Sequence, residues 1–342
     1  MRAVVYERTG DPEVLRLVDK VLRDPGAGEV RVRVHRSGVN PTDWKSRRGP
    51  EAGRPVEPAQ TPNQDGAGVV DAVGPGVDVA LIGSRVWIWE AAYERPEGTA
   101  QEFAIVPLRR VVPLPDTASF DVGASLGVPF LTARRCLTVD EDGPRRLGPG
   151  TLAGRVVLVA GGAGAVGNAA IQLARWSDAT VITTVSGPEK ARLAAAAGAD
   201  HVINYRREDV AAEIGRIAPR GVHTVVEVSP AVNAALDAQV LARRGSVAVY
   251  ANDGGEEATL PVRALMVDNA RWQFVLMYTA PALAMAEGVE DIASALHQAA
   301  IRVGAQAGLP LHHFPLDRCV QAHAAVEDSA VGKVLIDVVE DE

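Results

Sequence analysis

Hydrophobic residues recur in two patterns along the chain, and the pattern changes near residue 118. Before that point, short runs rich in β-branched residues are separated by Gly and Pro, as at 30–35 and 68–73. Such runs predict short β-strands bounded by turns. Many short strands with little helix between them favour an irregular β-barrel for the first third of the chain.

From residue 155 onward, buried apolar runs alternate with amphipathic stretches. The runs at 156–160 and 180–185 predict strands, and the stretch at 166–176 has one apolar face and predicts a helix. Further strands are expected at 201–204, 224–228, 246–250 and 272–276, and further helices at 189–197, 209–217, 233–242 and 282–304. This alternation predicts a parallel sheet with helices on both faces, an α/β fold.

The last apolar run, at 334–338, predicts a strand that returns to the β-rich domain. The parallel-sheet domain is then an insertion. We expect the β-rich domain to comprise 1–124 and 282–342, and the inserted domain to comprise 125–281. The polar segment 140–150, with Pro and Gly, predicts an exposed loop.

A glycine-rich turn joins the first buried strand of the inserted domain to its helix. It reads Gly162-Ala163-Gly164-Ala165-Val166-Gly167 and fits the G-x-G-x-x-G pattern in the strand-to-helix context that the pattern requires. The helix start offers unpaired N–H groups and a partial positive charge to a pyrophosphate. We therefore expect a dinucleotide to bind at Ala163, Gly164, Ala165, Val166 and Gly167. The alternative is a glycine-rich turn that binds nothing.

The residues after the second strand of this domain favour NADPH over NADH. A site for NAD usually has an acid there, which binds the ribose hydroxyls, whereas this strand is followed by Ser186. Lys190 and Tyr205 come next, and a hydroxyl, a phenol and a cation suit a 2′-phosphate. The alternative is that Lys190 is a solvated surface charge and that Glu189 binds a ribose hydroxyl.

Composition excludes several other classes of protein. The formal net charge of -8, with scattered Lys and Arg, does not favour nucleic acid or an anionic membrane as partner. The two cysteines are far apart, which favours a reduced chain over a disulfide scaffold. We find neither a signal-peptide pattern nor about 18 consecutive apolar residues, and expect a cytoplasmic protein.

Segments along nearly the whole chain resemble the medium-chain dehydrogenase/reductase superfamily, and within it the zinc-free quinone oxidoreductase (zeta-crystallin-like) group. They include Ser37-Gly38-Val39-Asn40-Pro41, Asp65-Gly66-Ala67-Gly68, Gly127-Val128-Pro129-Phe130, the glycine turn, Gly198-Ala199-Asp200-His201 and Gly332-Lys333-Val334. The resemblance implies a Rossmann doubly wound parallel sheet inserted in a GroES-like β-barrel domain. It also implies a homodimer. The apolar run at 272–277 could form an edge strand that pairs with its copy across a two-fold axis, or it could be an interior strand of the sheet.

Zinc alcohol dehydrogenases of this superfamily hold their catalytic metal with Cys, His and Glu. The matching positions here are Asn40, Gln64 and Asp65, and the structural-zinc lobe, which needs four Cys, has none at 91–101. The ligand types that zinc prefers are therefore missing. We expect no metal site.

The resemblance also implies the catalytic residues. Asn40 would lie beside the nicotinamide and donate an amide N–H to a developing oxyanion, and Thr132 would contact the carboxamide. Lys45 stands where the group often has Tyr and would donate a proton, or is an exposed lysine paired with a carboxylate. Asn252 follows a strand of the inserted domain and is a further candidate for the cofactor site.

Three functions remain open at this point. The first is NADPH-dependent, metal-independent reduction of a quinone. The second is reduction of an enone or enoyl thioester, which needs the same hydride geometry. The third belongs to another class, an NADPH-binding structural or sensor protein without turnover. Turnover with a panel of acceptors separates the three.

Overall fold

The structure is a computed structural model that describes residues 1–339 and divides the chain into two compact units. The first unit contains Met1–Val128 and the chain from Leu311 onward, and the second contains Pro129–Pro310. The second unit is thus inserted in the first. We expected residues 282–310 to belong to the first unit, but they belong to the second. Helix α9 (Ala282–His297) belongs to the second unit because Asp291 accepts a hydrogen bond from Arg134 Nε at 2.8 Å.

The first unit is built from two β-sheets. One has the strand order β2-β1-β4, and the other has the order β15-β16-β3-β5-β6-β8, with β7 also paired to β3. The strands are β1 (Arg2–Arg8), β2 (Arg16–Asp19), β3 (Glu29–Val39), β4 (Pro55–Gln60), β5 (Asp65–Val73), β6 (Arg85–Ile88), β7 (Phe103–Pro107), β8 (Val111–Pro113), β15 (Leu311–Pro315) and β16 (Lys333–Asp337). Its helices are α1 (Pro41–Arg48), α2 (Phe120–Gly123) and α10 (Cys319–Glu327).

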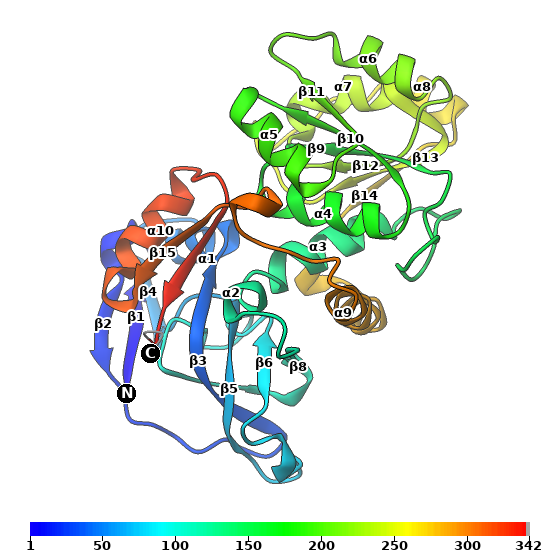
Figure 1. Ribbon diagram of the computed structural model, residues 1–342. Coiled ribbons are helices and arrows are strands. Elements are labelled where there is room, and N and C mark those ends of the chain that lie inside the picture. Colours follow the sequence, from blue (N-terminus) through cyan, green and yellow to red (C-terminus); the bar gives the residue numbers. More distant parts are fainter. Residues whose placement is uncertain (340–342) are drawn as a thin grey trace. The chain divides into compact units, whose positions relative to one another are not determined.

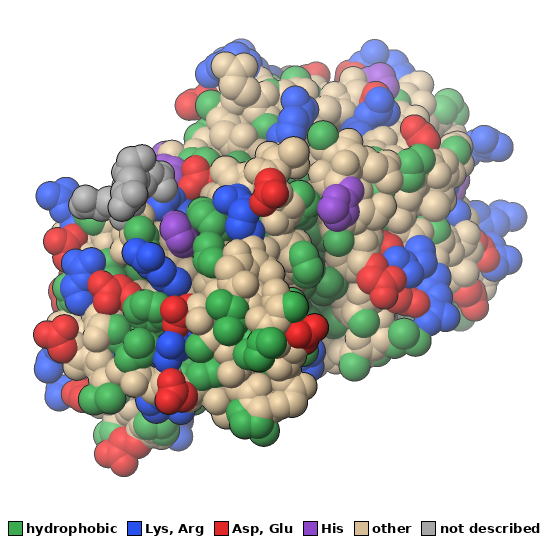
Figure 2. All heavy atoms as spheres, turned by 60° about the horizontal axis from the view of Figure 1, so that its bottom comes forward, with side chains coloured by type: hydrophobic (Ala, Val, Ile, Leu, Met, Phe, Trp, Pro, Cys, Tyr) green, Lys and Arg blue, Asp and Glu red, His purple; other side chains and the backbone are tan. Residues whose placement is uncertain are grey.

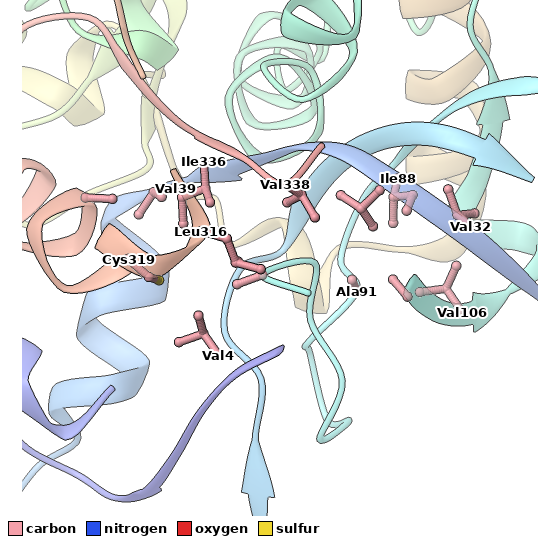
Figure 3. Packing of buried hydrophobic residues seen from close by; sticks show 14 of the residues in the cluster. Val4, Val32, Val39, Ile88, Ala91, Val106, Leu316, Cys319, Ile336 and Val338 are labelled. Carbon is pink, nitrogen blue, oxygen red and sulfur yellow. The ribbon is translucent and has the colours of Figure 1, made fainter. Parts of the chain in front are cut away.

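One hydrophobic core holds the first unit together, and it draws on both ends of the chain. Val4 from β1, Val32 from β3 and Ile336 from β16 belong to a single cluster of buried side chains (Figure 3). β16 pairs antiparallel with β3, so that Val334 lies opposite Val39. The predicted return of the chain's last strand is therefore observed, and it brings Lys333 next to the end of β3.

The second unit contains a six-stranded parallel sheet with the order β11-β10-β9-β12-β13-β14 (Figure 1). This is the doubly wound order, in which the chain starts at the centre of the sheet and reverses direction once. The strands are β9 (Val156–Ala160), β10 (Thr180–Val185), β11 (His201–Asn204), β12 (Val222–Glu227), β13 (Leu241–Val249) and β14 (Arg271–Phe274). The helices are α3 (Gly127–Leu137, beginning in the first unit), α4 (Ala165–Trp176), α5 (Pro188–Ala197), α6 (Val210–Ile217), α7 (Pro230–Val240), α8 (Val262–Val267) and α9. The predicted α/β class is confirmed.

Some predicted helix bounds were wrong. We expected a helix at 233–242, but α7 starts at Pro230, which suits the first turn because it needs no N–H there. It ends at Val240, because Leu241 pairs with Val222 as a strand. The helix expected over 282–304 ends at His297.

Within residues 1–339, no helix is both long and apolar enough to cross a bilayer. Figure 2 shows acidic and basic side chains interspersed over the face that it presents.

Candidate active site

The glycine turn after β9 has the geometry of a phosphate-binding turn. Gly161 takes a left-handed φ of 72°. A Cβ on Gly162 would lie 2.1 Å from Thr183 Oγ1, and one on Gly167 would lie 2.4 Å from the Gly161 carbonyl oxygen, so neither position admits a side chain. Gly164 differs, since a Cβ there would approach no atom closer than 3.5 Å. Packing within the protein therefore does not require glycine at position 164. The open space that a Cβ would occupy there is where a ligand would approach the turn.

Helix α4 begins directly after Gly164, which is its N-cap. The first amides of a helix have no partner within it, and here they belong to Ala165, Val166 and Gly167. Ala163 is buried in the turn. A helix start combined with a turn of this kind suits the two charges of a pyrophosphate. The residues predicted for this site are brought together by the structure.

The predicted 2′-phosphate residues lie at the carboxyl edge of the same sheet. Ser186 follows β10 and Tyr205 follows β11, and these parallel strands are paired so that Val185 lies opposite Asn204. The Tyr205 amide donates to the Val185 carbonyl at 3.1 Å, which places the two strand ends side by side. Lys190 is half-buried on α5, and Tyr205 is 51% exposed. No acid follows β10 directly, because the chain continues Ser186-Gly187-Pro188.

Asn252 lies at this edge as well, after β13. Two strands, β9 and β12, separate β13 from β10 in the sheet, so Asn252 is not next to Ser186. Its exposed side chain donates to Glu256 Oε1 at 2.7 Å. Thr132 is buried within α3.

In the first unit, Asn40 is the N-cap of α1 and belongs to a buried polar cluster. Its Nδ2 donates to Asp65 Oδ2 at 2.7 Å, and Lys333 Nζ donates to its Oδ1 at 2.6 Å. Lys333 Nζ also lies 3.6 Å from Asp65 Oδ2. All three residues are buried, and Lys333 is only 1% exposed.

Two carboxylates surround this lysine, and backbone amides hold them. Asp65 accepts from the Val128 amide at 2.9 Å. Asp43 accepts from the amides of Asn40 at 2.7 Å and Gln64 at 3.1 Å. Burial raises the pKa of Asp43 to about 7, and the Asp65 charge adds to that shift. Burial lowers the pKa of Lys333, but Asp65 and Asp43 oppose the shift and favour the ammonium form.

The side chains at the three positions that match the zinc ligands are not the donor types that zinc prefers. Two of the three matching positions are amides, and Gln64 Oε1 already accepts from the Ala92 amide at 3.0 Å. The ammonium of Lys333 donates to Asn40 Oδ1 and lies 3.6 Å from the carboxylate at the third position, Asp65, and a cation in that place repels a metal ion. Zinc prefers thiolate and imidazole ligands. Among residues 1–339 there is no group of three His, Cys, Asp or Glu side chains arranged to hold a metal.

Lys45 does not join this cluster. It is exposed on α1, with Nζ 5.8 Å from the centre of the Trp44 ring, whereas Asn40 and Asp43 on the same helix are buried. Lys333 and Asp43, in contrast, were missed by the sequence analysis. The position of Lys333 directly before the apolar run 334–338 could have indicated that this lysine is buried. A buried lysine requires a charged or polar partner, which would have pointed to a polar cluster.

Comparison with known proteins assigns the family. Residues 26–116 match the family described as alcohol dehydrogenase GroES-like domain, and residues 165–294 match the zinc-binding dehydrogenase family. The chain is 31% identical over 340 residues to a quinone oxidoreductase of Rattus norvegicus, covering 98% of this chain and 97% of the relative. It is also 29% identical to the quinone oxidoreductase of Homo sapiens, over 98% of this chain and 97% of that one.

Solved structures agree over the full length. A structure described as an NAD-dependent alcohol dehydrogenase has 28% identity and a TM-score of 0.85, covering 99% of this chain and all of the other. A mycobacterial quinone oxidoreductase has 29% identity and a TM-score of 0.82, with the same coverage. The two units and the glycine turn define a two-domain oxidoreductase. The chain belongs to the medium-chain dehydrogenase/reductase superfamily, with quinone oxidoreductases as relatives along its whole length.

Proposed function

We propose that this protein is an NADPH-dependent reductase that transfers hydride to a quinone without a metal ion. The observation that carries the proposal is a contrast between the two units. The glycine turn keeps an open approach at Gly164, whereas two of the three positions matching the zinc ligands hold amides, and the buried ammonium of Lys333 lies beside them. This contrast supports a protein that binds the nucleotide and works without zinc.

The described residues fit NADPH. The amides of Ala165, Val166 and Gly167 would bind the pyrophosphate, and Ser186, Lys190 and Tyr205 would bind the 2′-phosphate. A mycobacterial relative, 29% identical over 99% of this chain, has been solved as a complex with NADPH. When bound, NADPH supplies a hydride from nicotinamide C4. Thr132 would contact the carboxamide, as the family resemblance implies.

Asn40 would stabilise the negative charge that develops on the substrate oxygen. Its Nδ2 carries two N–H groups, of which one is bonded to Asp65. The second would donate to the oxygen. A donor held in place before the reaction lowers the barrier without reorganisation at the moment of transfer. We retain Lys45 as a candidate proton donor from the sequence, but its exposed position favours Asn40 as the residue to test first.

The test is oxidation of NADPH by the full-length protein against a panel of acceptors, with and without a chelator. Turnover with 1,4-naphthoquinone, unchanged by chelator, is expected. Turnover with enones or enoyl thioesters alone would replace the quinone assignment with the second function. Tight NADPH binding without oxidation by any acceptor would favour a structural or sensor role. Loss of activity with chelator, restored by zinc, would refute metal independence.

Replacing Lys190 by alanine tests the preference for NADPH. We expect KM for NADPH to rise about tenfold with little change for NADH, because a charge-assisted hydrogen bond to the 2′-phosphate is lost. Arg192→Ala, on an exposed position of the same helix α5, is the matched control and should change neither value. Equal effects on both cofactors would show that Lys190 does not recognise the 2′-phosphate.

We also propose a homodimer formed through β14, the last strand in the sheet order. Phe274 on this strand is 69% exposed, and Leu276 just beyond it is 57% exposed. An edge strand with large apolar side chains suits pairing across a two-fold axis. Phe274→Asp is expected to yield a monomer in light scattering coupled to gel filtration. Val232→Asp is the control, since Val232 on α7 is also 69% exposed, and a monomeric wild-type protein would refute the dimer.

A further inference from the structure

A buried lysine lies at the start of the chain's last strand, and neither the family resemblance nor the proposed function gives it a role. Lys333 is the first residue of β16, and its side chain is fully enclosed within the first unit. An enclosed ammonium is costly unless partners offset its lost hydration. Its partners are Asn40 Oδ1 at 2.6 Å and Asp65 Oδ2 at 3.6 Å.

The chain makes room for this side chain. A Cβ on Gly38 would lie 3.1 Å from Lys333 Cε and 2.1 Å from the Ala124 carbonyl oxygen. Any larger residue at position 38 would therefore displace the backbone at Ala124 and also press on the lysine stem. Gly38 lies opposite Leu335 in the antiparallel pairing of β3 with β16. This register places Lys333, two residues before Leu335, at the end of β3 beside Asn40.

Lys333 and Asp65 together allow only one orientation of the Asn40 amide. An ammonium can only donate hydrogen bonds, and an ionised carboxylate can only accept them. Burial raises the pKa of Asp65, and the charge of Lys333 and the hydrogen bonds from Asn40 and Val128 oppose that shift and favour the carboxylate. The amide oxygen must therefore face Lys333 and the amide nitrogen must face Asp65, as the 2.6 Å and 2.7 Å contacts show. The opposite orientation would place donor against donor and acceptor against acceptor. The Asn40 backbone is fixed too, since its amide donates to Asp43 at 2.7 Å.

We propose that Lys333 is a positioning residue for hydride transfer. Its ammonium holds the Asn40 side-chain oxygen, so that the amide nitrogen is directed to Asp65 and its second N–H is kept for the substrate oxygen. This inference rests on the function proposed above. A cation on the amide oxygen also polarises the amide and strengthens donation by its nitrogen. Lys333 itself neither transfers a proton nor contacts the substrate.

The kinetic test is a double-mutant cycle in the full-length protein, with NADPH and 1,4-naphthoquinone. We expect Lys333→Met to lower kcat by about 100-fold with little change in KM for NADPH, at the lower end of the loss expected for one oxyanion donor. Asn40→Ala should cause a similar loss. If Lys333 acts through Asn40, the double variant Asn40→Ala/Lys333→Met should have the kcat of Asn40→Ala alone. Additive losses, or an unchanged kcat in folded Lys333→Met, would overturn the proposal.

Two further variants keep the test decisive if Lys333→Met does not fold. Lys333→Gln keeps an N–H that can donate to Asn40 Oδ1. The double variant Lys333→Met/Asp65→Asn has no such donor, and it leaves no unpaired charge because both side chains are neutral. We expect Lys333→Gln to have the higher kcat of the two. Equal kcat in these two variants would show that donation to Asn40 is not the role of Lys333. A purely structural role would lower thermal stability but would not produce this order in kcat.

A readout without turnover separates this proposal from the proposed function. Selective ¹⁵N labelling of asparagine gives the side-chain NH₂ signals, and that of Asn40 is identified by its loss in Asn40→Ala. We expect it to shift and broaden in Lys333→Met/Asp65→Asn, because neither an ammonium nor a carboxylate then requires one orientation of the amide. An unchanged signal would overturn the positioning role even in an active enzyme. A changed signal in a protein that oxidises no NADPH would refute only the reductase function.

Discussion

Replacing Gly164 by valine is expected to raise KM for NADPH by about 100-fold, close to 2.7 kcal/mol of lost binding, while the protein stays folded. The turn itself admits the side chain. Gly164 has φ -79° and ψ 165°, which any residue adopts, and a Cβ there would approach nothing closer than 3.5 Å. The valine would instead occupy the side from which a pyrophosphate approaches the amides of α4. Cofactor binding is therefore lost without loss of the fold.

Two other glycines serve as controls for this prediction. Gly162→Ala should destabilise the second unit, because its Cβ would lie 2.1 Å from Thr183 Oγ1. Gly215→Ala, on α6 where a Cβ meets nothing within 4 Å, should change neither KM nor stability by much. Calorimetry and NADPH titration distinguish the three. An unchanged NADPH affinity in folded Gly164→Val would place the cofactor away from this turn and remove the basis of the reductase proposal.

The sequence predicted the second unit well, because its elements repeat a simple pattern. Buried strand runs, helix periodicity and a glycine turn in strand-to-helix context each indicated the same parallel sheet. Residues 162–167, Ser186 and Tyr205 follow strand ends directly, so strand order alone brings them to one edge. Gly161, whose φ of 72° makes the turn, was not singled out, since the motif begins one residue later.

The polar cluster of the first unit was only half predicted. Asn40 and Asp65 were recognised through resemblance, but Lys333 is 293 residues from Asn40 in the sequence. Only the antiparallel pairing of β16 with β3 places them together, and no local pattern specifies that register. Lys45 was selected because of its position after Asn40-Pro41, yet helix α1 directs it outward while Asp43 is buried. Helical periodicity over only eight residues, 41–48, was too short to show which side is buried.

The segment 140–150, which we expected to be an exposed loop, is anchored by a buried ion pair in the second unit. Arg134 on α3 donates through Nε to Asp291 Oδ2 on α9 at 2.8 Å and through Nη2 to the Arg145 carbonyl at 2.7 Å. Asp291 also accepts from Arg146 Nε at 2.6 Å and from the Leu147 amide at 3.0 Å. Both members of the pair are buried. One carboxylate thus connects α3, α9 and the segment.

Asp291→Ala is expected to lower the free energy of unfolding by about 3–5 kcal/mol, because the buried Arg134 guanidinium loses its nearest counter-charge and keeps Glu287 Oε2 only at 3.9 Å from its Nη2. In a unit of this size that corresponds to a fall in Tm of roughly 10 °C. Arg134→Met/Asp291→Leu, which removes both charges, should recover much of the loss. Arg145→Ala breaks the ion pair between Arg145 and Glu287. Because the Arg145 side chain is 67% exposed, this loss should lower the free energy of unfolding by less than about 1 kcal/mol. Denaturant unfolding measures all three. A loss for Asp291→Ala no larger than that for Arg145→Ala would show that packing of α3 on α9, and not the charge pair, holds the segment in place.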